Sequence, residues 1–148
     1  MPSNSTQNYL KIMYSLFLSD GKTQVKGSEL SKRLGISQAA VTDMIRRLAS
    51  DGFAENVPYK GIRLTQKGID IGRTMVRHHR IWEVFLHQEL HIPLDQIHQE
   101  AEHLEHAGSN FLINQLDKKL GFPTHDPHGN PIPSRDGHIP PPSALQAS

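Results

Sequence analysis

Apolar residues recur at intervals of three and four positions along the first part of the chain, which is the spacing of amphipathic helices. Residues 8–18 follow this pattern, and a shorter helix is expected over residues 28–34. Ser28 is the expected N-cap of that second helix, and Gly35 is its expected stop. Ser37 is expected to cap a third helix. The pattern therefore predicts three helices, of which the last two are joined by a tight turn.

Short β segments replace the helical spacing after the third helix. Residues 53–57 and 62–64 are expected to be strands, and the turn between them at residues 58–61 contains a proline and a glycine. Two helices joined by a tight turn and followed by a hairpin make up a winged helix-turn-helix.

Helical spacing returns after Thr65, which is expected to cap a long helix reaching about His91. Two further helices are expected over residues 94–107 and 109–120. Seven of the ten prolines lie in residues 123–148, where the periodicity fails. This tail is expected to be an extended, partly disordered linker, as in a piece of a longer protein.

These elements predict a mostly α fold in three parts. The winged helix-turn-helix is expected to occupy residues 1–72, a wholly helical second domain residues 73–122, and the Pro-rich tail residues 123–148. The chain has no cysteine, which excludes disulfide frameworks, cysteine-based zinc fingers and thiolate catalysis. Neither a signal peptide nor a run of 18 apolar residues is found, so we expect a cytoplasmic protein.

The net charge of +1 conceals a strong division along the chain. Residues 1–80 contain 13 Lys and Arg against 6 Asp and Glu, whereas residues 81–148 contain 3 against 9 together with 8 of the 10 histidines. A basic half suits a polyanion such as DNA, and an acidic half rich in histidine suits cations.

The winged module is expected to place the start of its third helix in the major groove of duplex DNA. Serine, threonine and glutamine can hydrogen-bond to base edges, an alanine methyl can contact thymine, and basic side chains can bind phosphates. The expected DNA-binding residues are Lys26, Ser28, Ser37, Gln38, Ala39, Thr42, Asp43, Arg46, Arg47 and Lys60.

Histidines and glutamates of the second domain recur at helical spacing. His79 and Glu83 are four residues apart, and a second group occupies about 100° of arc on the next helix. The six candidate metal ligands are His79, Glu83, His98, Glu102, Glu105 and His106. Imidazole and carboxylate ligands without sulfur suit Mn²⁺, Fe²⁺, Co²⁺, Ni²⁺ or Zn²⁺.

Three histidines of the predicted tail fall outside this pattern. His125, His128 and His138 are therefore expected to bind nothing.

Several stretches in this order and spacing resemble the diphtheria toxin repressor family of metal-dependent regulators. They are YLKIMY at residues 9–14, the third helix at residues 37–48, LTQKG at 64–68, RHHR at 77–80, HQEAEHLEH at 98–106 and DPHGNPIP at 126–133. The resemblance implies a homodimer in which each subunit carries a winged domain and a helical dimerisation domain with one or two metal sites. It further implies repression of metal-uptake genes from a palindromic operator.

The resemblance also implies an assignment of ligands. His79, Glu83 and His98 match one metal site of the family, and the other site is matched by Glu102, Glu105 and His106. Glu102 stands where iron-type members have cysteine and manganese-type members have an acid, which favours Mn²⁺ over Fe²⁺.

The first helix departs from the family pattern. Its ligand position, Met or Asp in the family, is Asn8 here, a neutral amide that can still coordinate through its oxygen. One turn further on, Lys11 stands where manganese-type members have an acid.

Two alternatives remain open beside a metal-dependent repressor. One is a winged-helix regulator that responds to an organic ligand or to a protein. The other is a metallohydrolase, because a metal held by His and Glu can activate water. We expect a regulator that is not an enzyme, that binds no small organic substrate and no membrane, and whose cofactor is Mn²⁺ or Fe²⁺.

Overall fold

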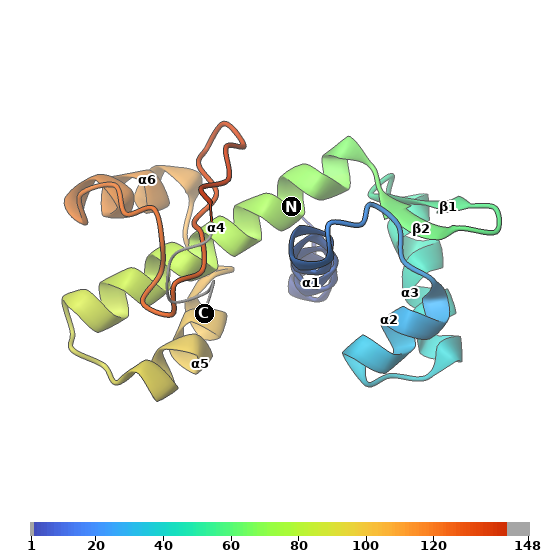
Figure 1. Ribbon diagram of the computed structural model, residues 1–148, viewed down its shortest axis with the longest axis horizontal. Coiled ribbons are helices and arrows are strands. Elements are labelled where there is room, and N and C mark those ends of the chain that lie inside the picture. Colours follow the sequence, from blue (N-terminus) through green and yellow to red (C-terminus); the bar gives the residue numbers. More distant parts are fainter. Residues whose placement is uncertain (1, 142–148) are drawn as a thin grey trace. The chain divides into compact units, whose positions relative to one another are not determined.

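The computed structural model describes residues 2–141 and divides the chain into two compact units, Met1–Gly72 and Arg73–Ser148. The described residues confirm a mostly helical fold. Its elements are α1 (Asn4–Asp20), α2 (Gly27–Leu34), α3 (Gln38–Ser50), β1 (Ala54–Val57), β2 (Gly61–Leu64), α4 (Gln66–Gln88), α5 (Leu94–Leu104) and α6 (Asn110–Lys119) (Figure 1). The boundary between the units falls within α4. Among the described helices, none is long and apolar enough to cross a membrane.

The first unit contains the expected helix-turn-helix. Gly35 ends α2 in the left-handed region, with φ 66°, and its N–H donates to the Ser31 carbonyl at 3.0 Å. The Ser37 hydroxyl accepts the Ala40 N–H at 3.1 Å, so Ser37 is the N-cap of α3 as predicted. The prediction for Ser28 is wrong. Lys26 is the N-cap residue of α2, and Ser28 lies inside the helix because α2 begins at Gly27.

The wing is an antiparallel pair of strands, in which Ala54 of β1 lies opposite Leu64 of β2. A bridge between Val25 and Ile62 joins the hairpin to the segment before α2. Gly61 permits this approach, since a Cβ there would overlap the Val25 carbonyl. The hairpin is thereby fixed to the helical part of its own unit.

The apolar face of each helix in the first unit meets a common core. Its buried members are Leu10, Met13, Tyr14, Val25, Leu30, Val41, Met44, Leu48, Phe53, Ala54, Ile62 and Leu64. At the end of the hairpin, the Thr65 hydroxyl accepts the Gly68 N–H at 3.2 Å, which gives α4 the cap that the sequence predicts.

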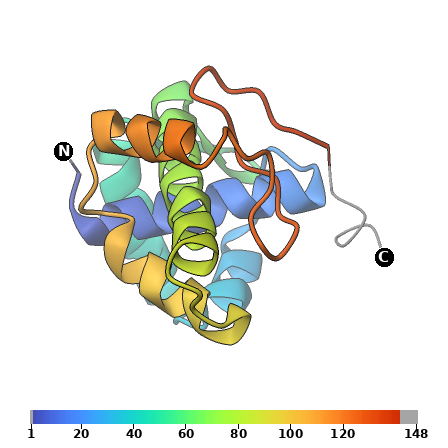
Figure 2. The same cartoon turned by 90° about the vertical axis from the view of Figure 1, so that its left-hand side faces the viewer.

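The second unit is built around the C-terminal half of α4, which α5 and α6 flank (Figures 1 and 2). One buried cluster joins α4 to α6 and contains Ile81, Val84 and Ile113. Another joins α4 to α5 and contains Leu86, Ile97 and Ala101. The periodic apolar positions of the sequence therefore become two adjoining cores that hold the three helices together.

The segment after α6 differs from its prediction. Residues 123–141, here called the C-terminal segment, form no helix or strand, but they fold back beside α4 (Figure 2). Ile132 is 3% exposed and belongs to the same core cluster as Ile81. Arg77 donates to the Pro133 carbonyl at 3.1 Å, and Arg80 donates to the Pro131 carbonyl at 2.6 Å. The predicted disordered linker is thus wrong for this part, and residues 142–148 of that prediction lie outside the described residues.

Candidate metal centre

The metal centre begins with two side chains one turn apart on α4. His79 and Glu83 are both buried, with 6% and 2% of their surfaces exposed. Their i, i+4 spacing places them on one face of α4, while Ile81 faces the hydrophobic core. A helix of this length therefore supplies both an apolar stripe and a ligand stripe.

His98 of α5 completes a set of three potential ligands. Its Nδ1 lies 3.1 Å from His79 Nε2, which itself lies 3.4 Å from Glu83 Oε1. One ligand atom from each of these residues lies within 4.8 Å of the other two. We call His79, Glu83 and His98 the first ligand set.

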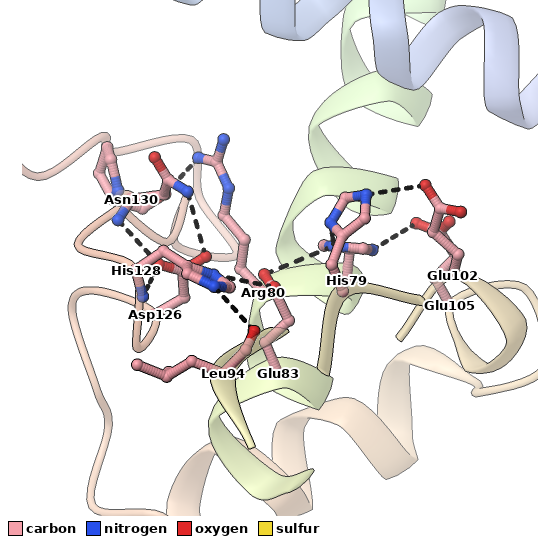
Figure 3. A network of polar contacts seen from close by, with 11 residues as sticks. His79, Arg80, Glu83, Leu94, Glu102, Glu105, Asp126, His128 and Asn130 are labelled. Atoms are coloured by element: carbon pink, nitrogen blue, oxygen red, sulfur yellow. Dashed lines mark hydrogen bonds and ion pairs between the residues drawn. The ribbon is translucent and has the colours of Figure 1, made fainter. Parts of the chain in front are cut away.

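Two further glutamates lie beside the outer nitrogens of these histidines (Figure 3). Glu105 Oε2 is 3.3 Å from His79 Nδ1, and Glu102 Oε1 is 2.9 Å from His98 Nε2. When each ring carries its hydrogen on this outer nitrogen, both inner nitrogens keep their lone pairs. Such outer carboxylates orient metal-binding histidines and increase their basicity. The three lone pairs of the first ligand set then converge, as coordination of a cation requires.

The structure brings together one group of the family assignment, the first ligand set, and the assignment of the other three predicted ligands to a second site stays a prediction. Glu102 and Glu105 lie against the histidines of the first ligand set, and His106 Nε2 is 4.0 Å from Glu105 Oε1. Glu102, Glu105 and His106 are not among the groups of three ligand atoms that lie within 4.8 Å in the described chain. Asn8 lies in the first unit, at an exposed position of α1, and its role as a ligand stays a prediction.

Sequence reasoning did not include two other residues that the structure brings to Glu83. Asp126 and His128 of the C-terminal segment form with Glu83 a second group whose ligand atoms lie within 4.8 Å. The stretch DPHGN contains the signal, because Asp followed by Pro and then Gly-Asn is typical of an ordered turn. The prolines of residues 123–148 favour a linker instead, so the predicted ligands did not include Asp126 and His128.

His78, next to the first ligand set, has a structural role instead. Its Nε2 lies 3.0 Å from Asn110 Oδ1 at the start of α6. Burial lowers the pKa of His78 below its usual value, although the hydrogen bond to Asn110 acts in the opposite direction. The pair of adjacent histidines in RHHR thus divides between two neighbours, since His79 faces α5 and His78 faces α6.

The first unit presents a polar face of a different kind. All ten residues predicted to bind DNA are exposed: Lys26, Ser28, Ser37, Gln38, Ala39, Thr42, Asp43, Arg46, Arg47 and Lys60. On α3, the Thr42 hydroxyl donates to the Gln38 carbonyl at 3.0 Å, and Arg47 lies 3.5 Å from Asp43. At the tip of the wing, Tyr59 is fully exposed beside Lys60, although sequence reasoning did not select it.

An exposed helix with a wing, combined with a His and carboxylate centre in which His79 and Glu83 are buried, is the arrangement of a metal-responsive DNA-binding protein. Family models agree with both halves. Residues 1–62 match the N-terminal DNA binding domain of the iron dependent repressors, and residues 65–134 match their metal binding and dimerisation domain. The chain belongs to the iron-dependent repressor family.

Relatives from several organisms resemble this chain. It is 35% identical over 114 residues to an uncharacterized HTH-type transcriptional regulator, MJ0568, of Methanocaldococcus jannaschii, covering 77% of this chain and 90% of that protein. It is 32% identical over 122 residues to the transcriptional regulator MntR of Oceanobacillus iheyensis, covering 82% of this chain and 81% of that protein. The iron-dependent repressor IdeR of Mycobacterium bovis is 32% identical over 130 residues, which are 88% of this chain but 56% of IdeR.

Solved structures share the fold. A manganese-dependent transcriptional repressor in complex with manganese has a TM-score of 0.78 at 40% identity, over 93% of this chain and 62% of that one. ScaR with bound Zn²⁺ has a TM-score of 0.76 at 32% identity, over 93% of this chain and 63% of that one. The chain thus spans less than two thirds of the length of these solved relatives.

Proposed function

We propose that this chain is a homodimeric transcriptional repressor that binds DNA when it holds a divalent metal ion, and that it controls metal-uptake genes. The observation that carries the proposal is the first ligand set, in which His79, Glu83 and His98 converge. Membership of the iron-dependent repressor family, and the presence of both of its domains, support the same function.

The donor set favours Mn²⁺ or Fe²⁺ as the activating ion. Nitrogen comes from two imidazoles and oxygen from Glu83, with the carboxylates of Glu102 and Glu105 immediately outside. The chain has no cysteine to provide a soft sulfur ligand. Two imidazoles and one carboxylate suit Fe²⁺, and the carboxylate also suits Mn²⁺, so availability in the cell would decide between these two.

A homodimer would present two copies of α3 to DNA, and its operator would be a palindrome with half-sites one or two helical turns apart. Exposed apolar side chains in the second unit support dimerisation, because Phe111 and Leu112 of α6 are 73% and 43% exposed. Within each copy, the residues predicted to read bases lie at the exposed start of α3.

Metal-resolved DNA binding tests this function. Duplexes would first be selected from a random pool by the Mn²⁺-loaded chain. Their affinity would then be measured by fluorescence anisotropy with Mn²⁺, Fe²⁺, Co²⁺, Zn²⁺ or chelator. We expect tight binding with Mn²⁺ or Fe²⁺, weak binding with chelator, and no metal response in His79→Ala. Equal affinity of the unaltered chain with and without metal would refute the proposal.

His103→Ala is the matched control for His79→Ala, because His103 is exposed on α5 and belongs to neither group of ligand atoms. Its metal response should equal that of the unaltered chain. A loss of response in both variants would instead indicate a general effect of removing a histidine.

A further inference from the structure

Two potential metal ligands lie outside the first ligand set, on a tight turn of the C-terminal segment. The Asp126 carboxylate accepts the backbone N–H groups of His128 and Asn130 through Oδ1, at 3.0 and 2.8 Å. The turn is attached to α4 because Arg80 donates to the Pro131 carbonyl at 2.6 Å. Asp126 and His128 are therefore held at a defined place beside α4.

The orientation of His128 is that of a metal-binding histidine. Its Nε2 lies 3.1 Å from the Leu94 carbonyl oxygen, which can only accept, so Nε2 carries a hydrogen and donates it. In the neutral ring, Nδ1 then keeps its lone pair, and it lies 3.4 Å from Glu83 Oε2. A histidine that donates one ring N–H to a backbone carbonyl while its other nitrogen faces a carboxylate is arranged as metal ligands are.

Both carboxylates of this group are also buried. Glu83 is 2% exposed and Asp126 is 5% exposed, and one ligand atom from each lies within 4.8 Å of the other and of His128. Carboxylates taken out of water are costly unless a positive charge or hydrogen bonds compensate them. Arg80 of α4, which donates to this turn, is the protein's own cation beside it, so an experiment must distinguish its charge from that of a metal.

Glu83 belongs to both groups of ligands, and each of its oxygens faces a different histidine (Figure 3). Oε1 is 3.4 Å from His79 Nε2, and Oε2 is 3.4 Å from His128 Nδ1. A carboxylate placed in this way can coordinate two ions, one through each of its oxygens.

We propose that Glu83, Asp126 and His128 form a second ligand set that holds its own divalent metal ion, with Glu83 as the bridge to the first ligand set. One nitrogen and carboxylate oxygens suit Mn²⁺ or Fe²⁺. The ion fastens the C-terminal segment to α4, so residues 126–132 become a metal-binding part of the protein. The inference rests on the proposed function in one respect, the presence of a metal ion at the first ligand set. The choice of Asp126 and His128 as further ligands does not depend on it.

Equilibrium dialysis of the metal-stripped full chain against Mn²⁺ tests the second ligand set. His128→Ala removes the nitrogen ligand. Asp126→Asn keeps Oδ1 as an acceptor for the turn and removes the carboxylate charge. His138→Ala is the matched control, because His138 lies in the same segment and its hydrogen bond to Ser134 is made by its backbone N–H. Circular dichroism of the metal-free proteins verifies that each variant is folded.

We expect His128→Ala and Asp126→Asn each to bind one Mn²⁺ fewer per chain than the unaltered protein, and His138→Ala to bind the same number. The inference is overturned if both variants bind as many ions as the unaltered protein, even with reduced affinity. In that case, either a single ion is bound by the residues of both ligand sets together, or the charge of Arg80 alone compensates the two buried carboxylates. Failure of the proposed function gives another pattern, in which His79→Ala binds as many ions as the unaltered chain or Mn²⁺ leaves DNA affinity unchanged.

Hydrogen exchange provides a measurement that does not depend on counting ions. Mn²⁺ should slow the exchange of the amides of residues 126–132 by about tenfold or more, because an ion that binds only the closed turn opposes its opening. The same amides should show no Mn²⁺ effect in His128→Ala. Equal slowing in both proteins would contradict a metal ion on His128.

Discussion

The two units differ in how far they expose their functional residues. In the first unit, all ten residues predicted to bind DNA are exposed, so their side chains can reach a polyanion in solution. In the second unit, His79, Glu83 and Glu105 are buried, with at most 6% of the surface exposed. His98 of α5 is open to solvent instead, since its side chain is 62% exposed. Changes on the exposed DNA-binding face should therefore leave folding intact, whereas changes of the buried ligands should affect both metal binding and folding.

The largest expected effect concerns the buried ion pair of the second unit. Arg77 and Asp117 lie 3.0 Å apart, with side chains 8% and 15% exposed. Asp117→Ala would leave a buried guanidinium without its carboxylate, so we expect the free energy of unfolding to fall by about 3–5 kcal/mol. Denaturant unfolding of the metal-free protein measures it.

The matched control is the exposed pair of Asp43 and Arg47 in the first unit, whose side chains are 62% and 64% exposed. Asp43→Ala should change the same free energy by less than about 1 kcal/mol. Equal losses in the two variants would contradict the distinction between the units.

The next effect is on metal affinity. Glu83→Gln removes the charge of the carboxylate that both ligand sets share. Mn²⁺ affinity should therefore fall at least about 10–100-fold, which is the loss found when only a hydrogen-bond partner of a metal ligand is changed. DNA binding should then no longer respond to Mn²⁺. Isothermal titration with Mn²⁺ and anisotropy with the selected duplex measure the two effects.

Glu89→Gln is the control for this change, since Glu89 is exposed just beyond α4 and belongs to neither ligand set. Its metal affinity should equal that of the unaltered chain. A metal response retained in Glu83→Gln would show that the centre lies elsewhere.

A smaller effect is expected at the exposed start of α3. Gln38→Ala removes a side chain that can hydrogen-bond to a base edge, so the preference for the selected duplex over a random one should fall by about 1–3 kcal/mol. Thermal stability should stay nearly constant because Gln38 is exposed. Gln99→Ala, an exposed change on α5, is the control and should leave the preference intact. An unchanged preference in Gln38→Ala would show that Gln38 does not contact the bases.

The smallest effect is electrostatic. Arg46→Ala should weaken binding to selected and random duplexes equally and reduce the slope of log affinity against log salt by about 1, because one phosphate contact is lost. A salt titration of the metal-loaded protein measures the slope. Lys118→Ala, an exposed change at the end of α6, is the control. A loss confined to the selected duplex would instead assign Arg46 to base recognition.

Local signals of the sequence predicted the first unit well, because its elements depend on short-range chemistry. The glycine at the end of α2 and the serine before α3 produce a turn and a cap from neighbouring residues alone. Ser28 was the exception, since the cap is the last residue before the helical conformation begins, and that residue is Lys26, two positions earlier. Helical spacing likewise predicted His79 and Glu83 as neighbours on α4.

Distances between segments could not be predicted in this way. Residue types and spacing indicated which side chains could bind a metal, and the family pattern grouped Glu105 with His106. The contact of Glu105 with His79 is visible only in the folded chain, because it depends on how α5 packs against α4.

The same reason explains the C-terminal segment. Its prolines predict extended backbone, whereas residues 127–129 and 135–137 form turns. Composition also does not reveal that Ile132 inserts into the core or that Arg77 and Arg80 bind the carbonyl groups around it. Long-range packing brought Asp126 and His128 to Glu83, a contact between residues more than forty positions apart. Residue types and local turns therefore follow from the sequence alone. Which histidine lies beside each oxygen of Glu83 depends on the folded chain, because for His128 that contact is made between distant segments.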